Sequence, residues 1–141
     1  MRPEQAALIR TTWAQVTPLG IAAAALFYER LFALDPELGA MFAHTDMERQ
    51  GKKLLQALTG VVAAADRLHT LGPSLEELGR GHLRYGVMDR HYDTVGIALL
   101  ATLETALGPA FTAPVQEAWT LAYAGVATHM RTGARRVQQA A

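Results

Sequence analysis

The sequence of 141 residues contains no cysteine. This absence excludes disulfides, cysteine nucleophiles and every metal or cluster site that needs thiolate ligands. A metal centre in this chain must therefore use histidine, carboxylates or an imported cofactor. Asparagine is also absent, and Ser74 is the only serine. A serine nucleophile is disfavoured, because Ser74 fits a helix-capping motif instead.

The chain also lacks an excess of charge of one sign and a long apolar run. Thirteen basic and thirteen acidic side chains cancel, so no net field favours nucleic acid or an anionic membrane. The longest apolar run, residues 21–27, is far shorter than the ~20 residues that cross a bilayer. Arg2, Pro3 and Glu4 also stand where a signal peptide would begin its apolar block. We therefore expect a cytoplasmic protein that binds neither nucleic acid nor a membrane.

The apolar residues recur at helical spacing, and no stretch alternates with a period of two. Dipeptides that end in proline mark the breaks between helices: Thr17-Pro18, Asp35-Pro36, Gly72-Pro73 and Gly108-Pro109. The pattern predicts an all-α fold with six long helices and one short connector, over 4–16, 19–34, 36–42, 46–68, 74–85, 91–107 and 112–132. Six long helices favour a layered sandwich over a four-helix bundle.

Helix caps and domain limits follow from shorter motifs. Thr45 with Glu48, and Ser74 with Glu77, fit the S/T-x-x-E capping box. The arginine-rich end of the chain has no apolar period and no interleaved aromatic residues, so we interpret it as a frayed, solvated tail rather than a nucleic-acid patch. We expect one domain over 1–133 and a C-terminal tail over 134–141.

The stretch from Ser74 to Tyr92 carries the first candidate for chemistry, His82. Leu75, Leu78, His82 and Tyr85 recur every three or four residues, so we expect all four to face inward. Gly86 can end this helix in a left-handed conformation. Taken alone, such a histidine is more often a core residue bonded to a backbone carbonyl than a ligand.

Two more polar side chains lie on apolar helix faces, Tyr28 and Gln50. A buried hydroxyl without a partner costs about 1–3 kcal/mol, so Tyr28 needs a hydrogen bond. A core tyrosine bonded to a carbonyl and a solvent-facing glutamine are the ordinary alternatives. No H-E-x-x-H motif and no glycine-rich phosphate loop occurs. What remains is one inward histidine, an apolar helical interior and two inward polar groups.

In order and spacing, these residues resemble the globins, and among them the bacterial single-domain globins related to the globin part of flavohaemoglobins. The residues that carry the resemblance extend over nearly the whole chain: Phe27-Tyr28, Leu31-Phe32, Asp35-Pro36, Phe42, Gln50, Leu54, His82, Tyr85-Gly86-Val87, His91-Tyr92, Ala118-Trp119 and Tyr123. The resemblance implies the globin fold, a three-over-three helical sandwich around haem b (iron protoporphyrin IX).

The resemblance also implies a role for each site residue. His82 resembles the proximal iron ligand, and Tyr28 with Gln50 resembles the distal pair that donates hydrogen bonds to the oxygen ligand. Phe42 resembles the phenylalanine that wedges the haem, Leu54 the residue that limits room above the iron, and Tyr92 the tyrosine that approaches the proximal histidine. The other four histidines match no ligand position: His44, His69, His91 and His129.

One departure concerns the proximal side. A glutamate from the last helix usually joins the tyrosine and the proximal histidine in the flavohaemoglobin-type site. Here no acidic residue follows Glu117, and Gly133 and Ala134 stand in the expected region. A strongly anionic partner for His82 is therefore not expected.

The resemblance implies a globin that binds O2, NO and CO. Its leading role would be NO detoxification, as a nitric oxide dioxygenase that lacks its own reductase domain and draws electrons from an external reductase. The alternatives are O2 storage, transport or delivery, and gas sensing with a partner. In a cofactor-free helical interaction protein, His82, Tyr28 and Gln50 would be unrelated core residues. The amphipathic faces are all used by the core, so we expect a monomer.

Overall fold

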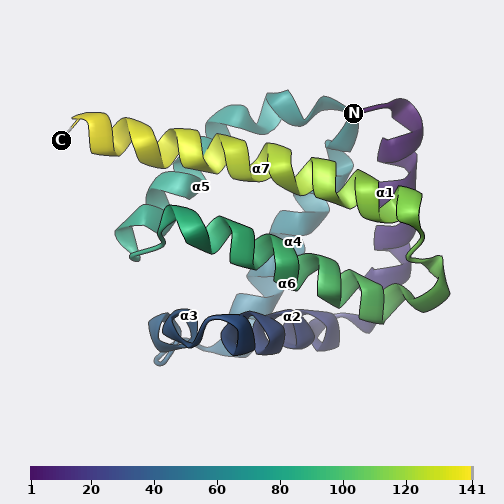
Figure 1. Cartoon of the computed structure of the whole chain (residues 1–141), viewed down its shortest axis with the longest axis horizontal. Helices are drawn as coiled ribbons and strands as arrows, with labels where there is room; N and C mark the ends of the chain where they lie inside the picture. Colours follow the sequence, from purple (N-terminus) through teal and green to yellow (C-terminus); the bar gives the residue numbers. More distant parts are fainter. Residues whose placement is uncertain (141) are drawn as a thin grey trace.

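The computed structural model describes residues 1–140, and Ala141, the last residue of the expected tail, lies outside them. The described chain is all-α and contains no strand (Figure 1). Its helices are α1 (Pro3–Val16), α2 (Ile21–Leu34), α3 (Pro36–Met41), α4 (Met47–Ala63), α5 (Gly72–Arg84), α6 (Asp89–Leu107) and α7 (Ala113–Ala140), with short 3-10 turns at Thr17–Leu19, Ala65–Leu71 and Gly108–Ala110. Six long helices and one short connector confirm the predicted pattern.

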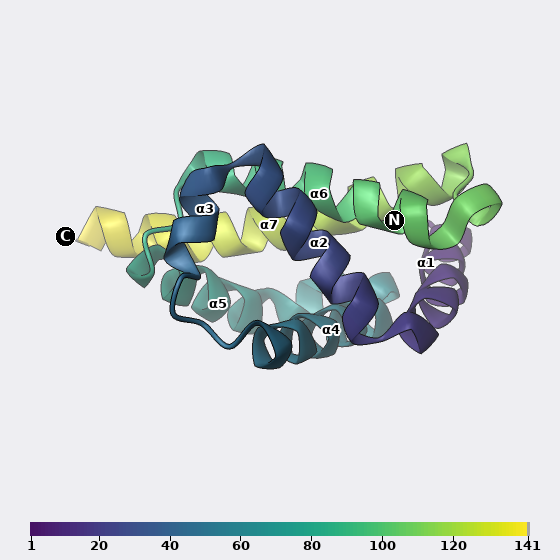
Figure 2. The same ribbon diagram turned by 90° about the horizontal axis from the view of Figure 1, so that it is seen from below.

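The helices pack in two layers. One layer contains α2, α6 and α7, and the other contains α1, α4 and α5. Figure 2 shows α4 and α5 on one side of α6 and α7. The layers are held together mainly where α5 and α1 cross α7 and where α4 packs on α2. Within its own layer, α2 also lies along α6.

A tryptophan anchors the centre of the core. Trp119 of α7 is 2% exposed, and its indole Nε1 donates to Thr12 Oγ1 of α1 at 2.9 Å. The ring of Trp13 lies 5.9 Å from that of Trp119, between ring centroids. A buried indole N–H needs such an acceptor. This contact therefore ties the first helix to the last.

Two glycines let α5 approach α7 closely. A Cβ added at Gly79 would lie 2.0 Å from the carbonyl oxygen of Met130, and one added at Gly133 would lie 2.0 Å from that of Glu76. No side chain fits in either place. Because α5 carries His82, these glycines determine how far His82 lies from the last helix.

The last helix is longer than predicted. Helix α7 continues to Ala140, so the expectation of a frayed end beyond Gly133 is wrong for the described residues. Arg136 pairs there with Glu76, and Arg135 pairs with Asp89. Ion pairs to α5 and α6 provide the partners that the sequence pattern does not reveal. The division into a domain over 1–133 and a tail over 134–141 stays a prediction.

Several helix limits also differ from the prediction. Asp46, and not Thr45, caps α4 by accepting from the backbone N–H groups of Glu48 and Arg49. Helix α5 begins at Gly72, so Ser74 lies inside its first turn and caps nothing. A 3-10 turn replaces the predicted end of the fourth helix beyond Ala63, and a 3-10 turn with Gly20 delays the start of α2. Helix α6 begins at Asp89, where a loop was expected.

Two predicted caps are confirmed. Asp35 accepts from the backbone N–H of Glu37 at the start of α3. Gly86 adopts φ +92° after α5, with its N–H on the Leu83 carbonyl and the Val87 N–H on the His82 carbonyl. This is the double hydrogen bond of a Schellman motif. His82 is thus fixed at its backbone by the turn that follows it.

No described helix is by itself long and apolar enough to cross a membrane. Only Pro3–Leu19 and Ile21–Leu34 together reach that length and composition, across a bend of 98°.

Candidate haem and ligand site

Tyr28 of α2 and Gln50 of α4 lie within hydrogen-bonding distance of each other. The Gln50 side-chain Nε2 donates to the Tyr28 hydroxyl at 3.1 Å. Tyr28 is 7% exposed. Burial raises the pKa of its hydroxyl, and the Gln50 hydrogen bond lowers it by less. The hydroxyl therefore stays protonated at neutral pH. Its proton has no acceptor among the described residues and is available to another partner.

Phenylalanines surround the Tyr28 ring. Phe27, Phe32 and Phe42 lie 5.0, 5.8 and 5.6 Å from it, between ring centroids. Phe42 follows the last residue of α3 and also stacks near Phe32 at 5.5 Å. The structure thus places Phe42 beside the polar pair, in a half-buried apolar wall. A hydroxyl in such surroundings is desolvated, which strengthens any hydrogen bond that it makes.

Leu54 lies one helical turn after Gln50 and is half-buried. Together with Phe27 and Leu58 it lines a small apolar pocket of about 20 Å³, which Trp13 and Leu103 also line. The side chains around this pocket come from α1, α2, α4 and α6. Leu54 therefore borders both the polar pair and an apolar space.

His82 lies in the last turn of α5 and is half-buried. Its ring Nδ1 lies 2.8 Å from the Leu78 carbonyl oxygen. A carbonyl can only accept, so the contact requires the hydrogen on Nδ1. The neutral ring then carries its lone pair on Nε2, which makes no hydrogen bond within residues 1–140. An imidazole held in this way is prepared to ligate a metal through Nε2.

The predicted inward stripe on this helix is wrong in part. Leu75 is buried, but Leu78 is 41% exposed and Tyr85 is 83% exposed. Tyr85 follows the last residue of α5, where the chain already turns away from the helix. Helical spacing therefore predicts the position of Leu75 and fails at Leu78 and Tyr85.

Tyr92 is buried near the start of α6, but the structure gives its hydroxyl no hydrogen bond to His82 within the described chain. Its backbone carbonyl accepts from the Tyr123 hydroxyl at 2.6 Å. Its side chain belongs to a buried cluster with Leu75, and Val87 packs against that cluster. Burial raises the pKa of Tyr92, and nearby Arg131 lowers it by less. Burial raises the pKa of Tyr123 as well.

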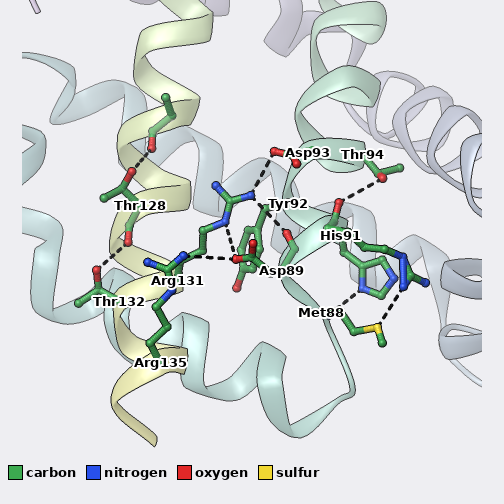
Figure 3. A network of polar contacts seen from close by, with 12 residues as sticks. Met88, Asp89, His91, Tyr92, Asp93, Thr94, Thr128, Arg131, Thr132 and Arg135 are labelled. Carbon is green, nitrogen blue, oxygen red and sulfur yellow. Dashed lines mark hydrogen bonds and ion pairs between the residues drawn. The ribbon is translucent and has the colours of Figure 1, made fainter. Parts of the chain in front are cut away.

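Arg131 of α7 lies next to the Tyr92 ring. No acidic residue follows Glu117 in this last helix, so a cation and not a carboxylate takes this place. The guanidinium carbon of Arg131 lies 5.2 Å from the Tyr92 ring centroid. Asp89 and Asp93 of α6 hold the guanidinium (Figure 3). Arg131 belongs to the arginine-rich end of the chain, for which the sequence pattern predicts only a solvated surface. The spacing of Asp89 and Asp93 places both carboxylates on one face of α6, but it does not indicate which helix packs there.

The remaining histidines are structural or exposed. His91 is fully buried, and its Nδ1 accepts from the Met88 backbone N–H at 2.8 Å. Its Nε2 lies 3.5 Å from the Asp35 carboxylate. Within residues 1–140, no group of three or more histidine and acidic side chains could hold a metal ion.

A layered helical domain with a free imidazole nitrogen, a buried tyrosine–glutamine pair and half-buried phenylalanines has the parts of a haem pocket. The globin family profile matches residues 25–130. The chain therefore belongs to the globin family.

Individual relatives agree with this assignment. A flavohemoprotein of Vibrio cholerae serotype O1 is 35% identical over 118 residues, which are 82% of this chain and 30% of that protein. A neuroglobin of Danio rerio is 30% identical over 139 residues, 89% of this chain and 87% of that protein. A flavohemoprotein of Bacillus subtilis is 33% identical over 103 residues, 72% of this chain and 26% of that protein. The chain thus spans under a third of either flavohemoprotein and most of the neuroglobin.

The family makes this chain a haem-binding, oxygen-binding globin. The residues present fit haem, because His82 offers an unoccupied ring nitrogen and Tyr28 an unclaimed proton. Half-buried phenylalanine and leucine side chains provide the apolar contacts that a flat macrocycle needs.

Proposed function

We propose that this globin removes nitric oxide as a dioxygenase that draws its electrons from a separate reductase. The reaction combines one NO, one O2 and one electron into nitrate, so every turnover needs an electron from outside. When bound, haem supplies an iron that accepts the diatomic ligand and the electron. The alternative is a protein that stores or delivers O2 without turnover.

The observation that carries this proposal is the hydrogen bond between Gln50 Nε2 and the Tyr28 hydroxyl. It orients the hydroxyl oxygen toward Gln50 and leaves the tyrosine proton free to donate elsewhere. A ligand that gains negative charge is stabilised by such donors more than a neutral one, since charge-assisted hydrogen bonds are about twice as strong as neutral ones. Two donors in apolar surroundings therefore favour O2 over CO and slow its escape.

His82 is the residue that we assign as the iron ligand, through Nε2. The Leu78 carbonyl holds the ring by its Nδ1–H and raises the basicity of the ligating nitrogen. We assign Phe42 and Leu54 to the walls of the pocket and Tyr92 to the support of the proximal side. Phe42 and Leu54 pack against the main apolar core, and Tyr92 lies in the smaller buried cluster with Leu75.

The flavohemoprotein relatives, by their name, support a haem-binding role over the part of their length that this chain matches. The external reductase, the cytoplasmic location and the monomeric state are predictions from the sequence.

The first experiment is the absorption spectrum of the purified protein and of His82→Ala, in ferric, reduced, CO-bound and O2-exposed forms. We expect a haem spectrum with a stable oxygenated form in the wild type, and loss or shift of the proximal signature in His82→Ala. A wild-type spectrum that His82→Ala leaves unchanged would contradict the assignment of the ligand.

The second experiment measures the O2 dissociation rate after removal of each donor. Tyr28→Phe and Gln50→Ala should each raise it by roughly 10- to 100-fold, because a hydrogen bond to a charged group contributes about 1.5–3 kcal/mol. Tyr85→Phe and Gln56→Ala are matched controls, since both side chains are exposed. Rates in Tyr28→Phe equal to those in Tyr85→Phe would refute the distal assignment.

Turnover separates the dioxygenase from the storage protein. With O2, NO and a generic electron donor, we expect catalytic loss of NO, stoichiometric nitrate and repeated return of the oxygenated spectrum. Rapid O2 release without nitrate formation would favour storage or delivery.

A further inference from the structure

Two hydrogen bonds and an ion pair to α6 hold Arg131 in one place. Its Nε lies 2.9 Å from the Asp89 carboxylate, and its Nη2 donates to Asp93 Oδ1 at 3.1 Å and to the Asp89 carbonyl at 3.2 Å (Figure 3). The side chain is only 23% exposed. A guanidinium held by two hydrogen bonds and an ion pair loses its freedom to rotate, which an ammonium group would keep.

The same guanidinium covers one face of the Tyr92 ring. Its central carbon lies 5.2 Å from the ring centroid, within the ~6 Å range of a cation–π contact. The Tyr92 hydroxyl makes no hydrogen bond to any described side chain, so no polar contact at its tip sets the ring orientation. The orientation of the Tyr92 ring is therefore set by the stacked guanidinium of Arg131 and by the apolar cluster beneath the ring.

That apolar cluster connects Tyr92 to the helix of His82. Leu75 of α5 is a buried member of it, and Val87 packs against it. The Val87 N–H donates to the His82 carbonyl at 3.1 Å. A change in the position of the Tyr92 ring is therefore transmitted to the turn that fixes the His82 backbone.

We propose that Arg131 is a positioning residue for His82, which it orients through the Tyr92 ring. The inference rests on the proposed role of His82 as the iron ligand. Arg131 links α7 to the first turns of α6, and the ring under it belongs to the cluster that holds Leu75 of α5 and Val87 after it. Residues behind a metal ligand commonly contribute 10- to 100-fold to metal affinity by such support.

Arg135 provides a matched control. It lies one helical turn after Arg131 and pairs with the same Asp89 carboxylate at 3.8 Å, but it is 62% exposed and does not stack on Tyr92. Arg135→Met therefore removes the same charge and an ion pair to the same residue while leaving the stacked contact intact.

The test uses the haem-loaded protein and two measurements, the rate of haem release to an excess of a haem-scavenging globin and the iron–histidine stretching frequency of the ferrous form. Arg131→Met should release haem roughly 10-fold faster and shift the stretching frequency. Arg135→Met should change neither. In a Tyr92→Leu background, Arg131→Met should add nothing, because two residues that act through one contact are not additive.

Equal effects of Arg131→Met and Arg135→Met, or full additivity with Tyr92→Leu, would overturn the proposal. Arg131→Lys carries the test if Arg131→Met does not fold: it keeps the charge but loses the planar stack, so we expect a shift of the same sign. A wild-type frequency in Arg131→Lys would overturn the proposal as well. Failure of the ligand assignment is recognised separately, since His82→Ala would then leave the spectrum unchanged.

Discussion

Replacing Gly79 by alanine would test how α5, and with it His82, is held against α7. An added Cβ would lie 2.0 Å from the carbonyl oxygen of Met130 and 2.6 Å from its carbonyl carbon. These are backbone atoms, which cannot rotate away as a side chain could. Ordinary contact begins near 3.4 Å, so the two helices must separate by about 1.4 Å. Overpacking costs typically 1–3 kcal/mol, and we expect about 3 kcal/mol here because backbone must move.

The same crossing offers a second site and a control. Gly133→Ala meets the Glu76 carbonyl oxygen at 2.0 Å and should cost a similar amount. Gly81, two residues after Gly79 on α5, has nothing within 4 Å of its added Cβ. Alanine is favoured over glycine by ~1 kcal/mol inside a helix, so Gly81→Ala should be neutral or stabilising.

The assay is urea unfolding of the haem-loaded proteins, followed by far-ultraviolet circular dichroism at one fixed haem concentration, because a bound ligand adds to apparent stability. The rate of haem release gives an independent readout. Gly79→Ala should speed haem release, since it displaces the helix that bears His82, whereas Gly81→Ala should not. Equal stability and equal haem release in the two variants would refute the close crossing of α5 and α7.

Three further predictions concern contacts away from this crossing. Thr12→Val should lower the free energy of unfolding by about 1–3 kcal/mol, because it leaves the Trp119 indole N–H buried without an acceptor; Thr12→Ser should restore most of it in the same urea titration. Asp46→Ala should cost about 1 kcal/mol by thermal unfolding through loss of a helix cap, and a larger cost for Thr45→Ala would contradict the observed cap. Burial raises the pKa of Tyr123, so above pH ~10 the unfolded chain loses this proton before the native one does, and stability should fall by about 1.4 kcal/mol per pH unit for this group. Tyr123→Phe should make that fall shallower, and an unchanged slope would show that Tyr123 does not contribute to it.

The helices could be predicted from the sequence because their signal repeats many times along each one. Each helix buries an apolar residue at every third or fourth position, so a single misleading residue does not change the predicted helix. Caps depend on single side chains and are less certain. Thr45 and Asp46 are adjacent and both can cap a helix, and only the backbone geometry decides for Asp46. Helix α5 likewise begins ahead of Ser74, at Gly72, because Pro73 is favoured in the first turn of a helix.

The candidate site was predictable where a polar side chain interrupts an apolar face. Tyr28 and Gln50 each stand out on their own helix, and burial then requires that they find partners. The sequence did not show that they would be each other's partner, since that depends on the packing of α2 on α4. The prediction that Tyr85 faces inward failed because Tyr85 keeps the helical spacing of the stripe but follows the last residue of α5.

Neither the helical repeat of apolar residues nor a polar side chain on an apolar face points to Arg131. Its acceptor Asp93 is 38 residues earlier in the chain, and the stretch around Arg131 has the charge and the poor apolar period of an exposed end. The role of Arg131 is recognised only after the helices are packed, because the structure then places its guanidinium over the buried Tyr92 ring. Interior helix faces can therefore be read from the sequence because burial acts on every residue of a stripe, whereas support that comes from an adjoining helix acts through one contact and needs the structure.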